Sequence, residues 1–381
     1  MSGKEKKKIS NNAIRTAIFL CLIAVSVFVC ANLLVFADAE YTNKVLEQFY
    51  DQEEDTVDVI YFGSSATQRG WVVPVAYHDD GVASYSIATG TQPFILTKYL
   101  MEEALKTQSP RLFAVELRGI CRTPDNISDV AVRRIIDNMK PSMNKFRAIK
   151  TVADYAKLGE NEVDDTGMSY YFPLLKYHSR WNPSKQPHYG TVDYYRGYAL
   201  DPIVSFKVQE MVPSDWNDGY DTEKMEVVES SKEILDDLLD YCDQLDGIDV
   251  VFIISPFEPY DIGMHKLNYV KGIVEDRGYE CIDFMPPENR EAIGLDNKTC
   301  YYNREHLNLY GSIKYTHYMA EYFKEHYNVP DRSGDSRYAG WEEDYERLVD
   351  TFKGVYKDKY DNMLKTIEEI EATENTESGA E

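Results

Sequence analysis

An uncharged apolar run near the N-terminus constrains this chain more than any other feature. Residues 17–37 read AIFLCLIAVSVFVCANLLVFA, and the lysine-rich segment KEKKK precedes them at residues 4–8. About 20 helical residues, each rising ~1.5 Å, are enough to cross the ~30 Å hydrocarbon core of a bilayer. Basic residues before such a span keep the N-terminus cytoplasmic. We therefore expect a cytoplasmic stub at residues 1–16, a transmembrane anchor at residues 17–37 and an extracellular main domain.

Two other interpretations of this run were weighed. A cleaved signal peptide is the first, because Ala37-Asp38-Ala39 has the small-x-small pattern of a cleavage site. The apolar region of a signal peptide is usually only ~7–15 residues long, which favours the uncleaved anchor. A buried core helix is the second, and the flanking charge and near-terminal position argue against it.

The charge of the chain is distributed very unevenly. The 381 residues include 41 Lys and Arg against 65 Asp and Glu, a formal net charge of -24. The first 40 residues hold five basic and three acidic groups, net +2, so the remainder carries -24 - 2 = -26. Such acidity excludes a nucleic-acid partner, which would need a basic face. A hydrophobic fraction of 43% excludes a disordered acidic chain.

The cysteines do not indicate a fold that depends on disulfide bonds or on a bound metal. Four of them lie outside the apolar run, at Cys121, Cys242, Cys281 and Cys300, where an oxidising exterior permits disulfides without requiring them. No CxxC pair or Cys/His spacing suggests zinc. Phosphate-binding glycine loops, dinucleotide fingerprints and calcium loops are not found either. We expect no metal and no other cofactor.

Apolar segments of strand length alternate with helical patterns along most of the chain. Strands are expected at residues 57–62, 82–87, 111–117, 249–254 and 279–284. Helices are expected at about 93–107, 223–246, 264–277 and 311–327. This alternation predicts an α/β domain at about 41–340, with a parallel sheet covered on both faces. Its ligand site would lie at the carboxyl ends of the strands.

Two regions depart from this alternation. Residues 122–222 are rich in aromatic and turn residues, which fits either an irregular cap with its own small core or a substrate-facing lid. His178 and Arg180 in this insertion are possible substrate-binding residues, with packing or surface roles as the alternative. Residues 341–381 predict an acidic helix, from Trp341 to about Ile370, followed by a disordered tail.

The first predicted strand ends at Gly63-Ser64-Ser65, just before a predicted helix start. A serine there projects at the carboxyl end of the strand, and its own backbone N–H can face a developing oxyanion. Gly90, after the second strand, can bring a second N–H close because it has no Cβ. By itself this pattern also fits a plain turn. It gains weight from His306, which precedes a Leu-Asn turn and the glycine that opens a late helix.

These segments carry a family resemblance. The blocks VDVIYFGSSATQ, YSIATGTQP, LFAVELRG and EHLNLYGSIKYT, and the stretch FPLLKYHSRW, resemble membrane-anchored, exported SGNH-like proteins of bacterial surfaces. Those proteins are relatives of the D-alanyl-transfer protein of lipoteichoic acid and of alginate O-acetyltransferases. The resemblance covers roughly residues 57–327. It implies a flavodoxin-like α/β/α sandwich.

The resemblance also assigns roles to residues. It implies that Ser65 is the nucleophile, that His306 is the general base, and that Ser65 and Gly90 offer oxyanion N–H groups. Gln92 and Arg118 are possible substrate-binding residues near the cleft.

Two departures from the family pattern leave the acidic partner open. The third block has Glu116-Leu117-Arg118-Gly119 where the family has an oxyanion Asn, and Asn303 replaces the Asp expected three residues before His306. A Ser-His dyad assisted by Asn303, a carboxylate supplied from elsewhere and a degenerate site all remain open.

Three functions follow from these readings. The first is a serine-dependent O-acyltransferase that modifies a surface or secreted glycan, with an integral membrane acyltransferase as the partner that the resemblance implies. A carbohydrate esterase or deacetylase would use the same residues with water as acceptor. The third is a non-catalytic surface protein that binds a glycan or a partner, which Asn303 favours.

Overall fold

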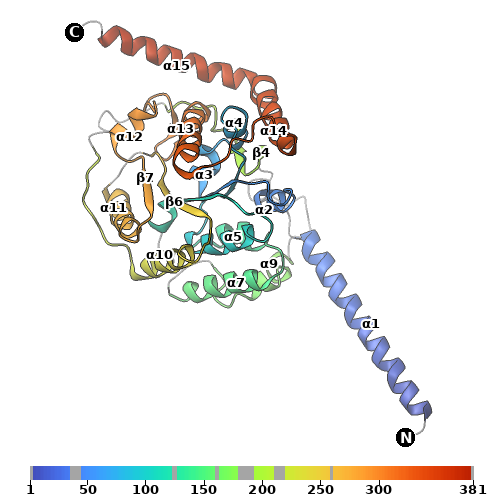
Figure 1. Cartoon of the computed structure of the whole chain (residues 1–381). Coiled ribbons are helices and arrows are strands. Elements are labelled where there is room, and N and C mark those ends of the chain that lie inside the picture. The colour runs from blue at the N-terminus through green and yellow to red at the C-terminus, as the bar shows by residue number, and fades with distance from the viewer. Residues whose placement is uncertain are drawn as a thin grey trace.

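The structure is a computed structural model that describes residues 3–34, 44–121, 127–158, 163–178, 193–209, 219–257 and 261–378. Within these residues, the main domain is built around a sheet of five parallel strands (Figure 1). They are β1 (Val59–Gly63), β2 (Ser84–Ala88), β3 (Leu112–Glu116), β6 (Asp249–Ile254) and β7 (Glu280–Asp283). The predicted α/β domain with a parallel sheet is confirmed, and each strand lies within two residues of its predicted bounds.

The strands β1, β2 and β3 are buried on both faces. All residues of β2 and β3 are buried, as are the first four residues of β1. A strand that packs helices on both sides has no solvent face, so its sequence is apolar without alternation. This explains why short continuous runs such as residues 249–254 identified the strands correctly.

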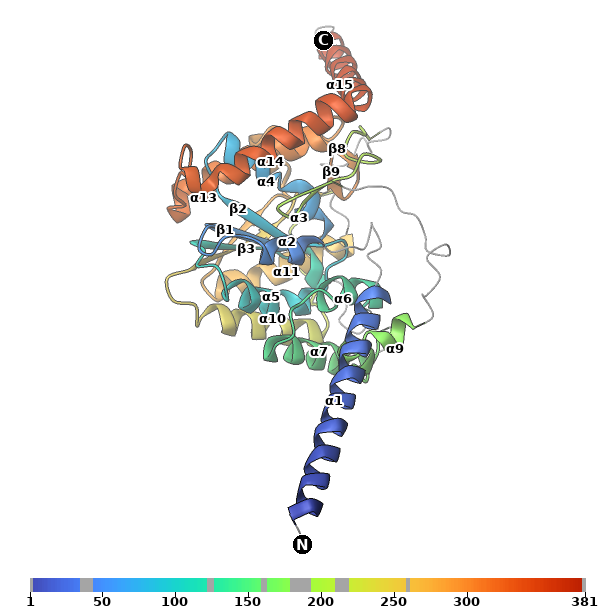
Figure 2. The same cartoon turned by 90° about the vertical axis from the view of Figure 1, so that its right-hand side faces the viewer.

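Helices cover both faces of the sheet (Figures 1 and 2). On one face lie α4 (Val73–His78), α13 (Leu309–Tyr327) and α14 (Ala339–Asp350), and on the other lie α5 (Thr97–Ala104) and α10 (Glu229–Cys242). The helix α11 (Asp261–Asp276) packs against β7. The predicted apolar stripe of α10 is buried, from Ile234 to Cys242.

The strand order places a crevice next to β1. The order is β2-β1-β3-β6-β7, so the chain moves from β1 to one side and then crosses back to β3 on the other side. Connections leaving β1 and β3 therefore diverge, and a crevice opens outside their carboxyl ends. Gly63 ends β1 and Glu116 ends β3, which brings the residues that follow them to this crevice.

The N-terminal helix α1 (Gly3–Leu34) extends away from the main domain (Figure 1). Its segment Asn11–Cys30 has a mean hydropathy of 2.4 and no buried residue. This helix is long and apolar enough to cross a membrane, as predicted, and a signal sequence meets the same criteria. The third interpretation, a buried core helix, is wrong, because residues 11–30 are exposed throughout.

The insertion contains more regular structure than its sequence suggested. Its described helices are α6 (Asp129–Ile136), α7 (Met143–Ala156), α8 (Met168–Tyr171) and α9 (Leu174–Tyr177). The helix α7 packs on α5 and on the short helix η1 (Phe94–Leu96), so it adds an outer helix to that face of the sandwich.

A small hairpin from the same insertion protects the edge of the sheet. It consists of β4 (Asp193–Tyr195) and β5 (Tyr198–Leu200), joined by Arg196 and Gly197 at positive φ. The carbonyl oxygen of Arg196 accepts a hydrogen bond of 3.0 Å from the backbone N–H of Ser86 on β2. The helix α2 (Lys44–Tyr50) also packs against β2. Covering an edge strand in this way prevents it from pairing with another chain.

The C-terminal region differs from its prediction in two ways. A π-helical turn, η5 (Thr351–Val355), separates α14 from α15 (Lys357–Ser378). Thr351 Oγ1 donates to the carbonyl oxygen of Arg347 at 2.8 Å, a contact that commonly bends helices. The helix α15 continues to Ser378, so most of the segment expected as a disordered tail is helical.

Candidate active site

The turn that follows β1 presents Ser65. Ser64 is the N-cap and Ser65 the first residue of α3 (Ser65–Gly70). Gly63 is required before this turn, because a Cβ there would lie 2.1 Å from Thr67 Oγ1 and 2.9 Å from Glu116 Cβ. Without a side chain at position 63, the chain can turn sharply beside β3 and leave Ser65 at the crevice.

His306 meets Ser65 from the other end of the chain. The distance between Ser65 Oγ and His306 Nε2 is 2.7 Å, across 241 residues of sequence. His306 begins β9 (His306–Leu307), which pairs with β8 (Tyr301–Asn303). The hairpin is anchored by buried Asn308, whose side chain caps α13 at Gly311 N and donates to the carbonyl oxygen of Thr299 at 2.7 Å.

Asn303 sets the tautomer of His306. The distance from Asn303 Oδ1 to His306 Nδ1 is 3.0 Å, and the same oxygen accepts from the backbone N–H of Glu305 at 2.9 Å. The Glu305 N–H fixes this amide atom as the oxygen, so Nδ1 of His306 must carry the proton. Nε2 then presents a lone pair to the Ser65 hydroxyl. An amide thus occupies the orienting position, where a catalytic triad has a carboxylate.

Tyr302 and Arg69 support His306, and no sequence motif pointed to either residue. The ring of Tyr302 stacks on the imidazole with 5.3 Å between centroids and an interplanar angle of 9°. Its hydroxyl accepts a hydrogen bond of 2.5 Å from Arg69 Nη1, and Arg69 also pairs with Asp201 at 3.2 Å. Burial raises the pKa of the Tyr302 phenol, so this ring stays neutral.

Glu116 lies under the turn that carries the serines. Its carboxylate accepts from Ser64 Oγ at 3.3 Å and from the backbone N–H of Arg118 at 3.0 Å. The side chain is 2% exposed, and burial raises the pKa of its carboxyl group. Glu116 therefore occupies the end of β3, where the family resemblance led us to expect an asparagine.

Arg118 connects the end of β3 to the hairpin that carries His306. Its Nη1 donates to the carbonyl oxygen of Glu305 at 2.9 Å, and Nη2 lies 3.7 Å from the Glu305 carboxylate. The guanidinium also lies over the ring of Phe257, 4.4 Å from its centroid. Through these contacts Arg118 holds the β8–β9 hairpin in place. It lies near the cleft, as predicted, but its guanidinium contacts the protein itself.

Gly90 and Gln92 lie on the loop after β2. Gly63 at the end of β1 pairs with Ala88 at the end of β2. Ser65 comes two residues after Gly63, and Gly90 comes two residues after Ala88. Arg134 on α6 donates to the Gly90 carbonyl oxygen, which brings the insertion to this loop. Gln92 is buried and its amide contacts the Ile87 carbonyl and Thr89 Oγ1, so it shapes the loop.

The remaining predicted residues lie elsewhere. His178 caps α9, where its Nδ1 contacts the Leu175 carbonyl oxygen at 2.9 Å. The helix α9 lies beside α1 rather than at the strand ends, so the structure does not bring His178 to Ser65 (Figure 2). Arg180 lies outside the described residues.

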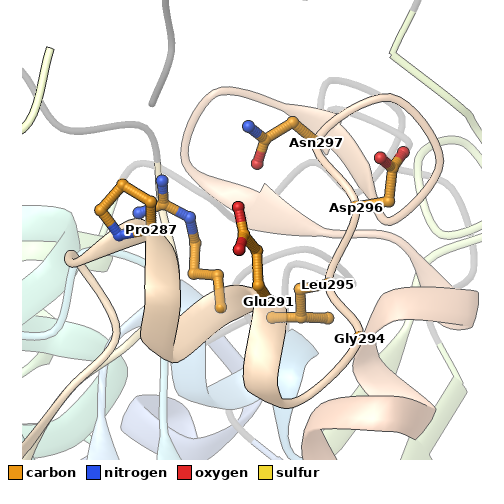
Figure 3. Close-up of a pocket in the computed structure, with 7 residues that line it drawn as sticks. Pro287, Glu291, Gly294, Leu295, Asp296 and Asn297 are labelled. Atoms are coloured by element: carbon orange, nitrogen blue, oxygen red, sulfur yellow. The ribbon is translucent and has the colours of Figure 1, made fainter. Parts of the chain in front are cut away.

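A separate pocket of about 280 Å³ lies on the segment that leads into β8 (Figure 3). Its walls are α12 (Pro287–Ala292) and the loop at residues 294–297. Arg290 in this lining is 1% exposed and donates to the carbonyl oxygens of Phe284 and Met285. The pocket includes neither Ser65 nor His306, so it is not the predicted active site.

Comparison of the chain with models of known protein families gave no match, and comparison with curated proteins gave none either. The SGNH-like resemblance therefore stays a prediction from short motifs. The case for a reaction depends on the geometry of Ser65, His306 and Asn303, and on the groups that hold them.

Proposed function

We propose that this chain is an extracytoplasmic, serine-dependent O-acyltransferase that modifies a surface or secreted glycan through an acyl-serine intermediate. The observation that supports it best is the relay from Ser65 Oγ through His306 to Asn303, with distances of 2.7 and 3.0 Å. The strand order supports it too, because 2-1-3-4-5 is the order of flavodoxin-like sheets.

The proposed chemistry has two steps. Ser65 Oγ attacks the carbonyl carbon of an acyl donor while its proton moves to His306 Nε2, and that proton then leaves with the donor alcohol or thiol. In the second step His306 Nε2 takes the proton of a glycan hydroxyl, which attacks the acyl-serine ester. The ester bond to Ser65 breaks, and His306 returns the proton to Ser65 Oγ. Backbone N–H groups of Ser65 and Gly90 would stabilise the oxyanion in both steps.

The imidazolium formed in each step needs stabilisation without a carboxylate at Nδ1. The Asn303 carbonyl dipole accepts the Nδ1 proton, and the face of the Tyr302 ring lies against the imidazole. An aromatic face attracts a cation by about 0.5–2 kcal/mol, depending on its exposure. This arrangement supports the Ser-His dyad assisted by Asn303 over a carboxylate from elsewhere.

Two alternatives keep specific support. A carbohydrate esterase would use the same relay with water in place of the glycan hydroxyl. A non-catalytic glycan- or partner-binding protein is favoured by Asn303 alone, since an amide supplies no charge to the imidazolium. For the transferase, an integral membrane partner would deliver the acyl donor.

A fluorophosphonate probe distinguishes the catalytic functions from the binding function. The full chain in detergent should gain one adduct, and peptide mass spectrometry should place it on Ser65. Ser65→Ala should lose the adduct, whereas the neighbouring Ser64→Ala should keep it. A wild-type chain that stays unmodified would eliminate both enzymes. With p-nitrophenyl acetate as donor, acyl transfer to added oligosaccharide at the expense of hydrolysis then identifies the transferase, and unchanged hydrolysis identifies the esterase.

A further inference from the structure

The helices of the insertion expose a group of large apolar side chains. We call this group the α7–α9 face, and it consists of Met143, Phe146, Met168, Phe172 and Leu175. Their exposed fractions run from 46% for Met168 to 72% for Met143. The rings of Phe146 on α7 and Tyr171 on α8 lie 5.2 Å apart, so the two helices meet at this face.

Apolar exposure on this scale indicates an interaction surface. Soluble domains commonly expose single apolar side chains, but large contiguous apolar patches mark sites that bind a partner or a membrane. The exposed residues Ile203, Met225 and Val355 lie on other segments of the chain. The α7–α9 face differs because its members come from α7, α8, α9 and the residue Phe172 that joins α8 to α9.

Within this face, the helix α7 and the residues that flank it are basic, although the domain as a whole is strongly acidic. Residues 139–158 contain five basic groups and one acidic group, a net charge of +4. The rest of residues 41–381 therefore carries -26 - 4 = -30. Lys150 and Lys157 both pair with Asp154, and Arg147 pairs with Glu102, yet the side chains of these three cations stay 68%, 55% and 52% exposed. Cations around an apolar face are typical of surfaces that lie on anionic lipid.

The membrane helix adjoins this face. The helix α9 contacts α1, and both views place α9 beside the C-terminal part of α1 with α7 next to it (Figures 1 and 2). The C-terminal end of α1 is where the chain would leave the bilayer. Helices beside that end lie at the level of the lipid headgroups, so the bilayer itself is the surface nearest to their exposed side chains.

We propose that the α7–α9 face lies on the bilayer, with Met143, Phe146, Phe172 and Leu175 inserted at the boundary between headgroups and acyl chains. Lys150 and Lys157 contact anionic headgroups around them. The main domain is then held in one orientation relative to the bilayer. This proposal requires α1 to remain as an anchor, but it does not depend on Ser65 being catalytic.

Lipid-borne quenchers test this contact in the full chain. Met143→Cys would carry an environment-sensitive fluorophore in a Cys21→Ala, Cys30→Ala background, reconstituted in phosphatidylcholine–phosphatidylglycerol vesicles. The other native cysteines interfere little, because burial raises the pKa of the Cys121 and Cys242 thiols to about 12. Val355→Cys is the matched control, since Val355 is 76% exposed on η5, across the sheet from α7.

The expected result is blue-shifted emission and strong quenching by headgroup spin labels at position 143, with neither effect at position 355. Phe146→Ser with Phe172→Ser should reduce the quenching at position 143 several-fold, as should Lys150→Glu with Lys157→Glu. Equal quenching at positions 143 and 355 would overturn the proposal. So would a water-exposed probe at position 143 in vesicles without other protein, which would assign the face to a protein partner instead.

Discussion

At the residue scale, the relay depends on which atom of Asn303 meets His306. Asn303 Oδ1 accepts from both the Glu305 N–H and His306 Nδ1, so the amide orients the ring as a carboxylate would. It differs from a carboxylate in having no charge and in carrying an NH2 donor in place of the second oxygen. The two functions of an acidic triad member, orientation and stabilisation of the imidazolium, are therefore separated in this site.

Asn303→Asp should raise esterase turnover, because a carboxylate adds charge to an orientation that already exists. In a serine protease the reverse change costs about 10⁴ in turnover, and a gain of about tenfold or more is expected here. Asn303→Leu should lower turnover, since it removes the group that holds the proton on Nδ1. Steady-state hydrolysis of p-nitrophenyl acetate measures both. A loss of turnover in Asn303→Asp would remove Asn303 from the orienting position.

Tyr302 offers a second residue-level test. Tyr302→Leu should lower turnover by about 3- to 30-fold, which corresponds to the ~0.5–2 kcal/mol of an aromatic face on a cation. Tyr302→Phe keeps the ring and loses only the contact with Arg69, so it should retain most of the turnover. NMR titration of His306 should show a lower pKa in Tyr302→Leu than in Tyr302→Phe. The same pKa in both variants would exclude stabilisation by the ring.

At the scale of elements, the β4–β5 hairpin shows how an irregular insertion protects the sheet. Arg196 lies 3.6 Å over the ring of Trp341 and pairs with Asp344 at 2.9 Å, both on α14. Its backbone carbonyl oxygen accepts the hydrogen bond from Ser86 on β2. One turn residue thus joins the edge of the sheet to the C-terminal helices.

Gly197→Ala should destabilise the domain far more than Gly247→Ala. Both glycines have positive φ, of 87° and 75°, so alanine costs about 1–2 kcal/mol at either position. At Gly197 a Cβ would also lie 1.8 Å from the Ser86 carbonyl oxygen, whereas at Gly247 it meets nothing within 4 Å. Denaturant unfolding should separate the two by about 2 kcal/mol or more. Equal losses would contradict the hairpin contact.

The junction of α13 with α4 should respond to pH through His317. The hydrogen bond to Asp80, at 3.0 Å, raises the pKa of His317 above its ordinary 6.5, and the charges of Asp80 and Asp79 add to it. A raised folded pKa gives stability that is complete below about pH 6.5 and is lost as pH rises through the folded value. His317 is 38% exposed, so the contribution stays under about 1 kcal/mol.

Thermal unfolding from pH 6 to pH 9 measures this contribution. The wild-type chain should lose slightly more stability over that range than His317→Gln, which has no proton to lose. Asp80→Asn should fall between the wild-type chain and His317→Gln, since it removes the main group that raises the pKa of His317 but leaves Asp79. A wild-type profile parallel to both variants would contradict the assignment.

At the scale of the whole molecule, the charge division and the apolar helix define two environments. Residues 1–40 carry +2 and the remainder carries -26, and the uncharged run at residues 17–37 lies between the lysine-rich segment and the acidic main domain. The net negative charge of the main domain repels it from anionic surfaces. The basic residues 139–158 around α7 are the exception, which is why the position of the α7–α9 face next to α1 matters.

The anchor itself is open to direct measurement. The full-length chain should remain in the membrane fraction after alkaline carbonate washing, because an uncharged helix of about 20 residues matches the hydrocarbon thickness. Intact mass spectrometry should then show residues 4–8 still attached. A soluble chain that begins near Ala39 would instead identify a cleaved signal peptide, and the α7–α9 proposal would fail with the anchor.

The sequence by itself determined the apolar helix, the charge division and the five strands of the sheet. These features follow from local composition, because burial on both faces or in lipid requires continuous apolar residues. It also selected Ser65, His306 and Asn303 as candidates through short motifs. It missed α6 and α7 as regular helices, since the aromatic and turn residues around them obscured their period.

Only the tertiary structure decided which side chains converge. Ser65 and His306 lie 241 residues apart, and no local pattern states that their atoms are 2.7 Å from each other. Tyr302 and Glu116 also lie at the site only because of the fold. In the sequence they are an ordinary residue of β8 and an ordinary residue at the end of β3. The α7–α9 face was equally hidden, because exposure depends on which neighbours the fold supplies. Composition sets the elements, and packing sets the contacts between elements that are distant in sequence.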